Sequence, residues 1–163
     1  MTTSTRDATA AAAAELDKGR GEVADFVGRF ERAWADPDPE RINALVHPDI
    51  EFIQPLEGVV RGHEEALAFW RRLFTLIPDI HGEVLSWGFG DDIVFIELRM
   101  IGTLGGKPIE WVTLDRIRLE DGKVRQRIAY FNPLPLVRAV VTRPRAWPRW
   151  LAAQRQSVRQ ASI

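Results

Sequence analysis

The feature that most constrains the fold is a run of four strand-like segments in the second half of the chain, joined by very short turns. The segments rich in β-branched and aromatic residues are 80–89, 93–104, 109–120 and 123–131. The turns that separate them are Gly90-Asp91-Asp92, Gly105-Gly106 and Asp121-Gly122, which suit tight hairpins. The sequence therefore predicts consecutive hairpins in one antiparallel sheet.

Amphipathic helices are expected ahead of these strands. Apolar residues recur with helical spacing in the segments 22–34, 39–46 and 62–76. A short strand at 50–54 and a turn region at 55–61 lie between the second and third helices. Helices followed by antiparallel strands form an α+β fold. We expect a cone-shaped α+β roll, in which three N-terminal helices pack on a curved, mainly antiparallel sheet that encloses an apolar pocket.

The composition fits one domain with two terminal extensions. Of the 163 residues 45% are hydrophobic, and six Trp and eight Phe are available for a core. We expect residues 1–20 to be a disordered or frayed arm, 21–132 to be the folded domain, and 133–163 to be a basic helical tail containing Pro and Trp.

Charge is unevenly distributed between the tail and the rest of the chain. Residues 133–163 carry six Arg and no acid, whereas the remainder has 16 Lys and Arg against 23 Asp and Glu, a net charge of −7. We expect the tail to dock on this acidic body. An anionic partner or a membrane surface is the alternative.

Several classes of function are not expected from the composition. The chain has no Cys, which excludes disulfides, zinc–thiolate sites and thiol nucleophiles. His47, His63 and His81 lack the spacing of a helical metal site, so neither a metal nor a cofactor is expected. We find no signal peptide and no apolar stretch near the roughly 20 residues that span a bilayer. A cytoplasmic protein that does not bind nucleic acid is therefore expected.

Asp115 is the most unusual polar residue, because it lies on the apolar face of a predicted strand. The alternate positions of that strand are Ile109, Trp111, Thr113, Asp115, Ile117 and Leu119. A buried carboxyl group must be paired, hydrogen-bonded or protonated. Arg127, on the neighbouring strand, is a candidate partner. If Arg127 reaches Asp115, the acid is ionised and serves as an anchor or a weak base; otherwise it is a protonated hydrogen-bond donor.

Several short strings resemble those of the nuclear-transport-factor-2-like superfamily, which includes SnoaL-like polyketide cyclases, ketosteroid isomerases and limonene epoxide hydrolases. The resemblance covers residues 23–132, which would then be a SnoaL-like domain. The strings are FERAW at 30–34, ALVHPDIEF at 44–52, PLEG at 55–58, RGHEEA at 61–66, PD at 78–79 and DGKV at 121–124. The resemblance implies the α+β cone, but the superfamily hosts several activities as well as proteins that catalyse nothing.

The catalytic residues of these relatives are only partly retained. The base, the tyrosine and the protonated aspartic acid of the ketosteroid isomerases fall on Gln54, Phe30 and Asp115. An amide cannot act as that base and a phenyl ring cannot donate, which argues against a conventional isomerase. The His and Asp of the cyclases fall on Arg127 and Asn132. The last-strand aspartate of the hydrolases falls near Ala129, and their second-strand pair is not reproduced.

These observations predict a SnoaL-like protein that binds a hydrophobic, oxygenated small molecule, polyketide-, terpenoid- or steroid-like. If it is an enzyme, we expect a cofactor-free isomerase, cyclase or hydrolase that uses Asp115 and Arg127. The alternative is a non-catalytic ligand-binding or dimerisation module. In either case we expect a homodimer through the outer sheet face, with Glu97, Arg99 and Arg116. The predicted ligand-binding residues are Phe30, Trp34, Phe52, Gln54, Leu98, Met100, Trp111, Thr113, Phe131 and Asn132.

Overall fold

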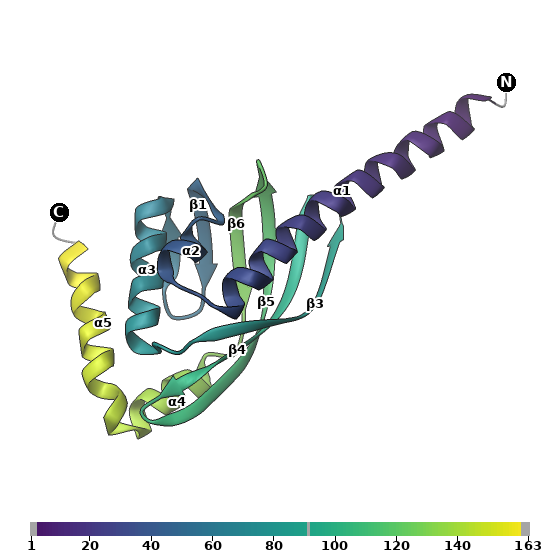
Figure 1. Ribbon diagram of the computed structural model, residues 1–163. Coiled ribbons are helices and arrows are strands. Elements are labelled where there is room, and N and C mark those ends of the chain that lie inside the picture. The colour runs from purple at the N-terminus through teal and green to yellow at the C-terminus, as the bar shows by residue number, and fades with distance from the viewer. Residues whose placement is uncertain (1–2, 91, 161–163) are drawn as a thin grey trace.

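A computed structural model describes the backbone of residues 3–90 and 92–160 and the side chains of 17–90 and 92–156. Figure 1 shows helices gathered on one side of a curved sheet, and a further helical segment at the C-terminal end. The helices that precede the strands, or lie between them in the chain, are α1 (Thr3–Ala35), α2 (Pro39–Asn43) and α3 (Gly62–Leu76). The strands are β1 (Val46–Gln54), β2 (Gly58–Arg61), β3 (His81–Gly90), β4 (Ile93–Leu104), β5 (Lys107–Glu120) and β6 (Lys123–Tyr130).

The six strands form one sheet in the order β2-β1-β6-β5-β4-β3. The hairpins from β3 to β6 are antiparallel, as predicted, whereas β1 pairs with β6 in parallel. The predicted α+β roll is confirmed. The turn predicted at 55–61 was wrong in its second half, which is the edge strand β2. Pro55 and Gly58 are residues typical of turns, and the strand that begins at Gly58 has only four residues, so no strand pattern could be recognised there.

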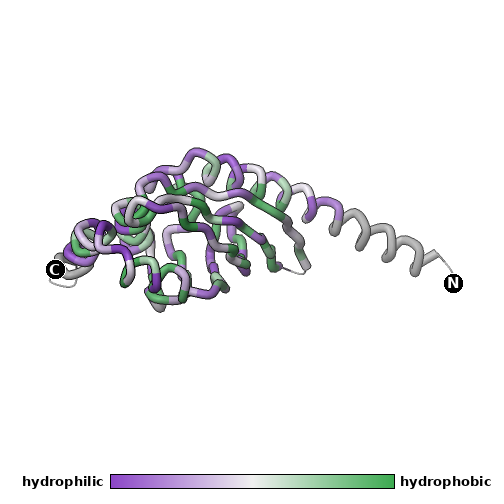
Figure 2. The backbone as a smooth tube through the Cα atoms, turned by 90° about the horizontal axis from the view of Figure 1, so that it is seen from below, coloured by the Kyte–Doolittle hydropathy of each residue, from purple (hydrophilic) through white to green (hydrophobic). Residues whose placement is uncertain are grey.

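The core lies between the helices and the concave face of the sheet. Helix α1 contributes Phe26, Phe30 and Trp34, which are all buried. This helix begins at Thr3, so it includes most of the segment that we expected as an N-terminal arm. The division of the chain into arm, domain and tail stays a prediction. Figure 2 shows that apolar residues follow the inner side of the chain, where helices and sheet meet.

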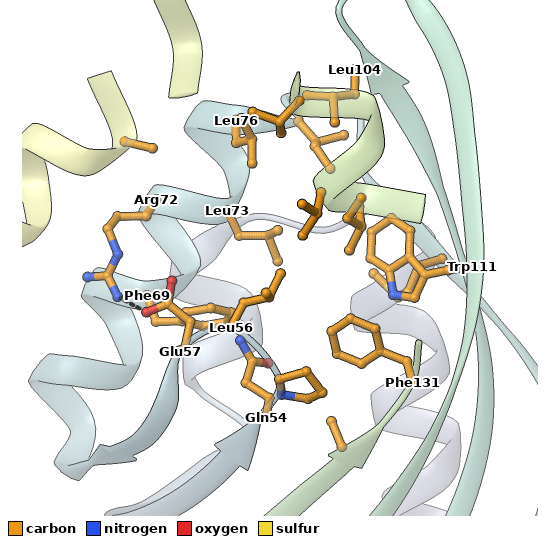
Figure 3. A pocket seen from close by; sticks show the side chains of 18 of the residues that line it. Gln54, Leu56, Glu57, Phe69, Arg72, Leu73, Leu76, Leu104, Trp111 and Phe131 are labelled. Atoms are coloured by element: carbon orange, nitrogen blue, oxygen red, sulfur yellow. Dashed lines mark hydrogen bonds and ion pairs between the residues drawn. The ribbon is translucent and has the colours of Figure 1, made fainter. Parts of the chain in front are cut away.

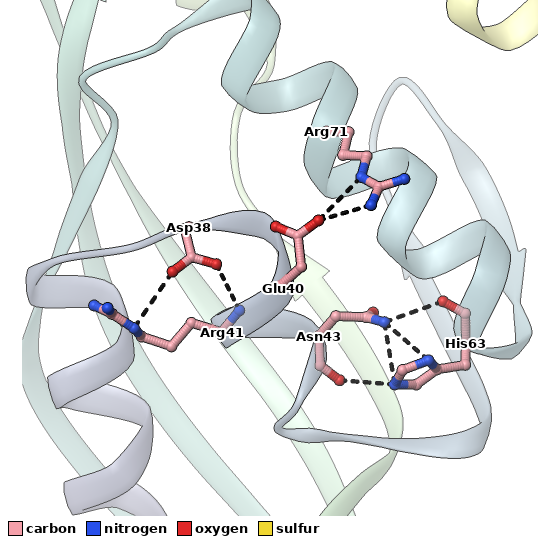
Figure 4. A network of polar contacts seen from close by, with 6 residues as sticks. All are labelled: Asp38, Glu40, Arg41, Asn43, His63 and Arg71. Atoms are coloured by element: carbon pink, nitrogen blue, oxygen red, sulfur yellow. Dashed lines mark hydrogen bonds and ion pairs between the residues drawn. The ribbon is translucent and has the colours of Figure 1, made fainter.

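Polar contacts attach the short helix α2 to α3 (Figure 4). Glu40 accepts a hydrogen bond of 2.7 Å from Arg71, and this bond lowers the pKa of the Glu40 carboxyl below its ordinary value. Asn43, which is buried, lies 3.0 Å from the ring of His63 through its Nδ2. Asp38 caps α2 by accepting from the Arg41 amide. These contacts leave His63 in a local, structural position at the start of α3.

The C-terminal segment folds back onto the domain as α4 (Leu134–Thr142), the 3₁₀ turn η1 (Pro144–Ala146) and α5 (Trp147–Gln160). The Arg143 guanidinium donates to the carbonyl of Leu104 at 2.8 Å and to that of Lys107 at 3.2 Å. Gly105 lies in the turn between β4 and β5 and has a φ of +64°. It is so close to Arg143 that a Cβ at this position would be 2.7 Å from the Arg143 Cβ. Helix α5 then runs beside α3 (Figure 1).

Within the described part of the chain, no helix combines the length and the hydrophobicity needed to cross a membrane.

Candidate functional site

A cavity of about 430 Å³ lies between α3, the sheet and the C-terminal helices. Its volume is within the range of small-molecule sites, which begins at roughly 300 Å³. Figure 3 shows Gln54 at one end and Leu76 and Leu104 at the other, with Trp111 and Phe131 along one side. The wall is mainly aliphatic and aromatic.

The structure brings seven of the predicted site residues to this cavity. They are Trp34, Gln54, Met100, Trp111, Thr113, Arg127 and Phe131. Trp111 and Phe131 lie with ring centroids 6.4 Å apart. Gln54 is at the end of β1, and Arg127 lies in the middle of β6. The polar groups among these seven therefore come from the sheet.

Five predicted residues do not line the cavity: Phe30, Phe52, Leu98, Asp115 and Asn132. Phe52 instead stacks on Trp70, with a centroid separation of 5.3 Å. Phe30 packs against Trp34 in the core. Leu98 is fully buried under α1 and β3. The Asn132 Oδ1 accepts from the Leu134 amide at the start of α4, so its role is local.

Asp115 and Arg127 form a buried ion pair, which is one of the two alternatives that the sequence left open. Arg127 donates from Nε at 2.8 Å, and its Nη2 lies 2.7 Å from the same oxygen, Oδ2. The Thr113 hydroxyl donates to Oδ1 at 3.1 Å. The exposed fraction is 0% for Asp115 and 9% for Arg127. Both oxygens of Asp115 accept hydrogen bonds, which is the arrangement of an ionised carboxylate.

Arg127 is the member of this pair that reaches the cavity. Asp115 lies behind it and fixes the guanidinium, and the Trp70 ring lies 5.7 Å from the Arg127 Cζ. Within the described part of the chain, the Arg127 Nη1 forms no hydrogen bond with another residue. A guanidinium stays charged and cannot act as a base. Placed in this way it can bind a carbonyl, enolate or carboxylate oxygen.

A second ion pair lies at the edge of the cavity. Glu57, in the turn between β1 and β2, accepts from Arg72 of α3 at 3.0 Å (Figure 3). Leu56, beside it, has a φ of +77°, a left-handed conformation that costs a non-glycine residue about 1 kcal/mol or more. Its side chain lines the cavity, and the Glu57–Arg72 pair holds this turn against the helix.

Two of the sets of lining residues that sequence reasoning missed lie on helices. The first is on α3 and comprises Phe69, Trp70, Arg72, Leu73 and Leu76. The second is on the C-terminal helices and comprises Leu136, Val137, Val140, Val141, Trp150, Ala153 and Gln154. The helical spacing of apolar residues on α3 could have predicted which face of this helix points inward. For the tail, the only signal was the alternation of Arg with apolar residues.

A separate group of possible metal ligands lies away from the cavity. His47, Glu120 and Asp121 each offer one ligand atom, and these atoms lie within 4.8 Å of one another. Both acids are exposed, and Glu120 is already paired with Arg125 at 3.3 Å. These contacts fit a surface cluster at the end of the β5–β6 hairpin.

One comparison with known proteins identifies a family. The family model described as a SnoaL-like domain matches residues 7–127. Comparison with the curated proteins finds no match. Among solved structures, an NTF2-like protein of unknown function from Burkholderia pseudomallei is 19% identical, with a TM-score of 0.66, and the match covers 73% of this chain and 97% of that one.

Two further structures have the same fold. A protein from Jannaschia that carries the name SnoaL-like polyketide cyclase has a TM-score of 0.64 at 20% identity, over 74% of this chain and 92% of that one. TerC, co-crystallised with polyporic acid, has a TM-score of 0.65 at 19% identity, over 73% of this chain and 98% of that one. At these identities the likeness establishes the fold alone.

Proposed function

The chain belongs to the SnoaL-like domain family, and from that premise we propose that it binds a hydrophobic, oxygenated small molecule in the cavity, with an oxygen held by Arg127. We place the ligand among polyketide-, terpenoid- or steroid-like compounds. The observation that carries the proposal is the nearly buried guanidinium of Arg127, which borders a mainly apolar cavity.

The charge and the walls of the cavity support this assignment. Asp115 uses the Nε and Nη2 of Arg127, which leaves Nη1 as the donor for a ligand oxygen. Gln54 and Thr113 add polar groups that, like Arg127, come from strands of the sheet, while Trp111 and Phe131 supply flat apolar surface. TerC, a structural relative, was co-crystallised with polyporic acid, which is consistent with a small-molecule cavity in this fold.

For catalysis, we propose cofactor-free chemistry on a carbonyl compound, of the isomerase, cyclase or hydrolase type. Arg127 would stabilise negative charge that develops on the bound oxygen, because a preorganised donor is most effective where water is excluded. Asp115 would act as a positioning residue, since its own oxygens are taken by Arg127 and Thr113. Its role in the reaction is thus exerted through Arg127.

A neutral replacement of the pair tests the proposal. Native mass spectrometry of the purified protein should first identify the molecule it retains. We expect the double variant Asp115→Asn/Arg127→Gln to bind that molecule roughly tenfold to a hundredfold more weakly, because a hydrogen bond from a charged group contributes about 1.5–3 kcal/mol. Isothermal titration calorimetry measures the change.

The matched control is Glu120→Gln/Arg125→Gln, which neutralises a surface pair on the same two strands. This control should bind as the wild type does. Equal affinity of the wild type and the Asp115/Arg127 variant, with both folded, would contradict the placement of the ligand oxygen at Arg127.

A dimer through the outer sheet face is the second proposal, and the exposed side chains there favour it. Phe95, Val112, Leu114 and Tyr130 are large, apolar and exposed on strands β4 to β6. Both signs of charge flank them, with the Arg99–Glu83 pair on one side and Arg116 on another. A second copy of this chain, related by a two-fold axis, could cover the apolar residues and pair the charges.

We expect Leu114→Arg to shift the protein from dimer to monomer, because a charge would be buried at the centre of that contact. Analytical ultracentrifugation measures the shift. Leu151→Arg is the control, since Leu151 on α5 is 48% exposed and Leu114 is 44% exposed. A monomeric wild type, or dimers in both variants, would rule out this interface.

A further inference from the structure

The C-terminal helices form one wall of the cavity, outside the span of the family match, which ends at residue 127. Helix α4 contributes Leu136 and Val140, and α5 contributes Trp150 and Ala153. We infer that this segment, residues 133–156, determines which ligands the cavity accepts, by setting how long an apolar part it admits. The inference rests on the proposed function of the same cavity.

Hydrogen bonds from Arg143 and Gln156 hold the wall to the domain, and one from Trp147 joins its two helices. Arg143 binds the carbonyls at the end of the β4–β5 hairpin, with 2.8 Å to Leu104 O. The Trp147 Nε1 donates to the Val140 carbonyl at 2.9 Å, which ties α5 to α4. Gln156 donates to the Thr75 hydroxyl of α3 at 3.3 Å. Because the middle of the wall, at Arg143, and its C-terminal part, at Gln156, are anchored to the domain, its side chains can define a fixed length.

Polar and apolar groups are separated along the cavity. Three polar lining residues, Gln54, Thr113 and Arg127, come from the sheet, and the Glu57–Arg72 ion pair lies at the cavity edge. The tail presents apolar side chains with the single exception of Gln154. In Figure 3 Gln54 lies at one end, and the end marked by Leu76 and Leu104 is apolar. A molecule that fits this arrangement has one oxygenated end and an extended apolar part directed towards the tail.

The tail also borders the opening of the cavity. Val141 lines the cavity although it is 66% exposed, so it lies where the apolar part of a ligand would meet solvent. Leu134, on the same helix, is 68% exposed and does not line the cavity. Val141 and Leu134 are almost equally exposed, but only Val141 lines the cavity. They provide a matched pair for enlarging one side chain on α4.

The experiment uses methyl ketones of 6 to about 12 carbons as probes, with calorimetry on the full chain. For the wild type, affinity should rise by about fourfold for each added methylene until the cavity is filled, as expected for burying one such group. Val141→Trp should end this rise at least two methylenes earlier, which makes the longest ketone at least about sixteenfold weaker. Leu134→Trp should give the wild-type series.

Each alternative result has a definite meaning. If Val141→Trp and Leu134→Trp give the same dependence on chain length as the wild type, the tail does not limit the ligand, and the inference fails while the proposed function stands. If no ketone binds the wild type, the proposed function fails and this inference fails with it.

Trp150→Ala, which removes part of the wall on α5, is a second test. In this variant the affinity should go on rising to longer ketones than in the wild type. An unchanged chain length at which the affinity stops rising would also overturn the inference.

Discussion

Replacing Asp115 by alanine is expected to lower the free energy of unfolding by about 3–5 kcal/mol, because it leaves the Arg127 guanidinium nearly buried without its counter-charge. The carboxylate accepts from Arg127 and from Thr113, so the substitution also leaves the Thr113 hydroxyl without an acceptor. Urea unfolding followed by circular dichroism measures the loss. Asp115→Asn keeps an acceptor oxygen and should lose less.

The control for this prediction is Glu120→Ala, which removes an acid from the same strand that also pairs with an arginine of β6. That pair is exposed to solvent, and its loss should cost at most about 1 kcal/mol. If both variants lost a similar free energy of unfolding, burial would not distinguish the Asp115–Arg127 pair from the Glu120–Arg125 pair. The Asp115–Arg127 pair would then have no special part in holding the cavity wall.

Replacing Trp34 by alanine is expected to lower the free energy of unfolding by a similar amount, about 3–5 kcal/mol, because the indole fills space that the core cannot close. Trp34 is 2% exposed, and its ring meets that of Trp70 edge to face at a centroid distance of 5.9 Å. It also borders the cavity, which the substitution would enlarge.

Trp87→Ala is the matched control, because it removes the same kind of side chain from a position on strand β3 that is 40% exposed. We expect this variant to lose less than half as much stability. Thermal unfolding and urea titration should agree on the order. A Trp34 variant as stable as the Trp87 variant would show that the α1 side of the cavity is loosely packed.

Arg127 could be recognised from the sequence as a candidate partner of Asp115, because their proximity depends only on strand periodicity and on one tight turn. Alternation along 109–119 put Asp115 on the inner face, and the Asp121-Gly122 turn set β6 beside β5. The register then places Ile117 opposite Arg127, one inward position from Asp115. Short-range rules of this kind are reliable, since every step involves neighbouring residues or neighbouring strands.

The shape of the cavity could not be predicted in this way, because it depends on how separate elements meet. Phe52 and Gln54 have the same orientation on β1, yet Phe52 stacks on Trp70 and only Gln54 reaches the cavity. The tail residues Val140 and Trp150 line the wall because Arg143 turns the chain back over the sheet. No periodicity in the sequence encodes such long-range contacts.

The parallel pairing of β1 with β6 has a consequence for the order in which the protein can form. Phe52 in β1 is the register partner of Arg127 in β6, which lies 75 positions later in the chain. Closing so long a loop carries an entropy cost before the contact stabilises anything, and contacts of this kind slow folding. During synthesis, β1 therefore has no partner on this side until β6 has left the ribosome. Arg127 lies on that same strand, and the helices α4 and α5, which form one wall of the cavity, follow it in the chain. The cavity is therefore complete only after these helices have been made.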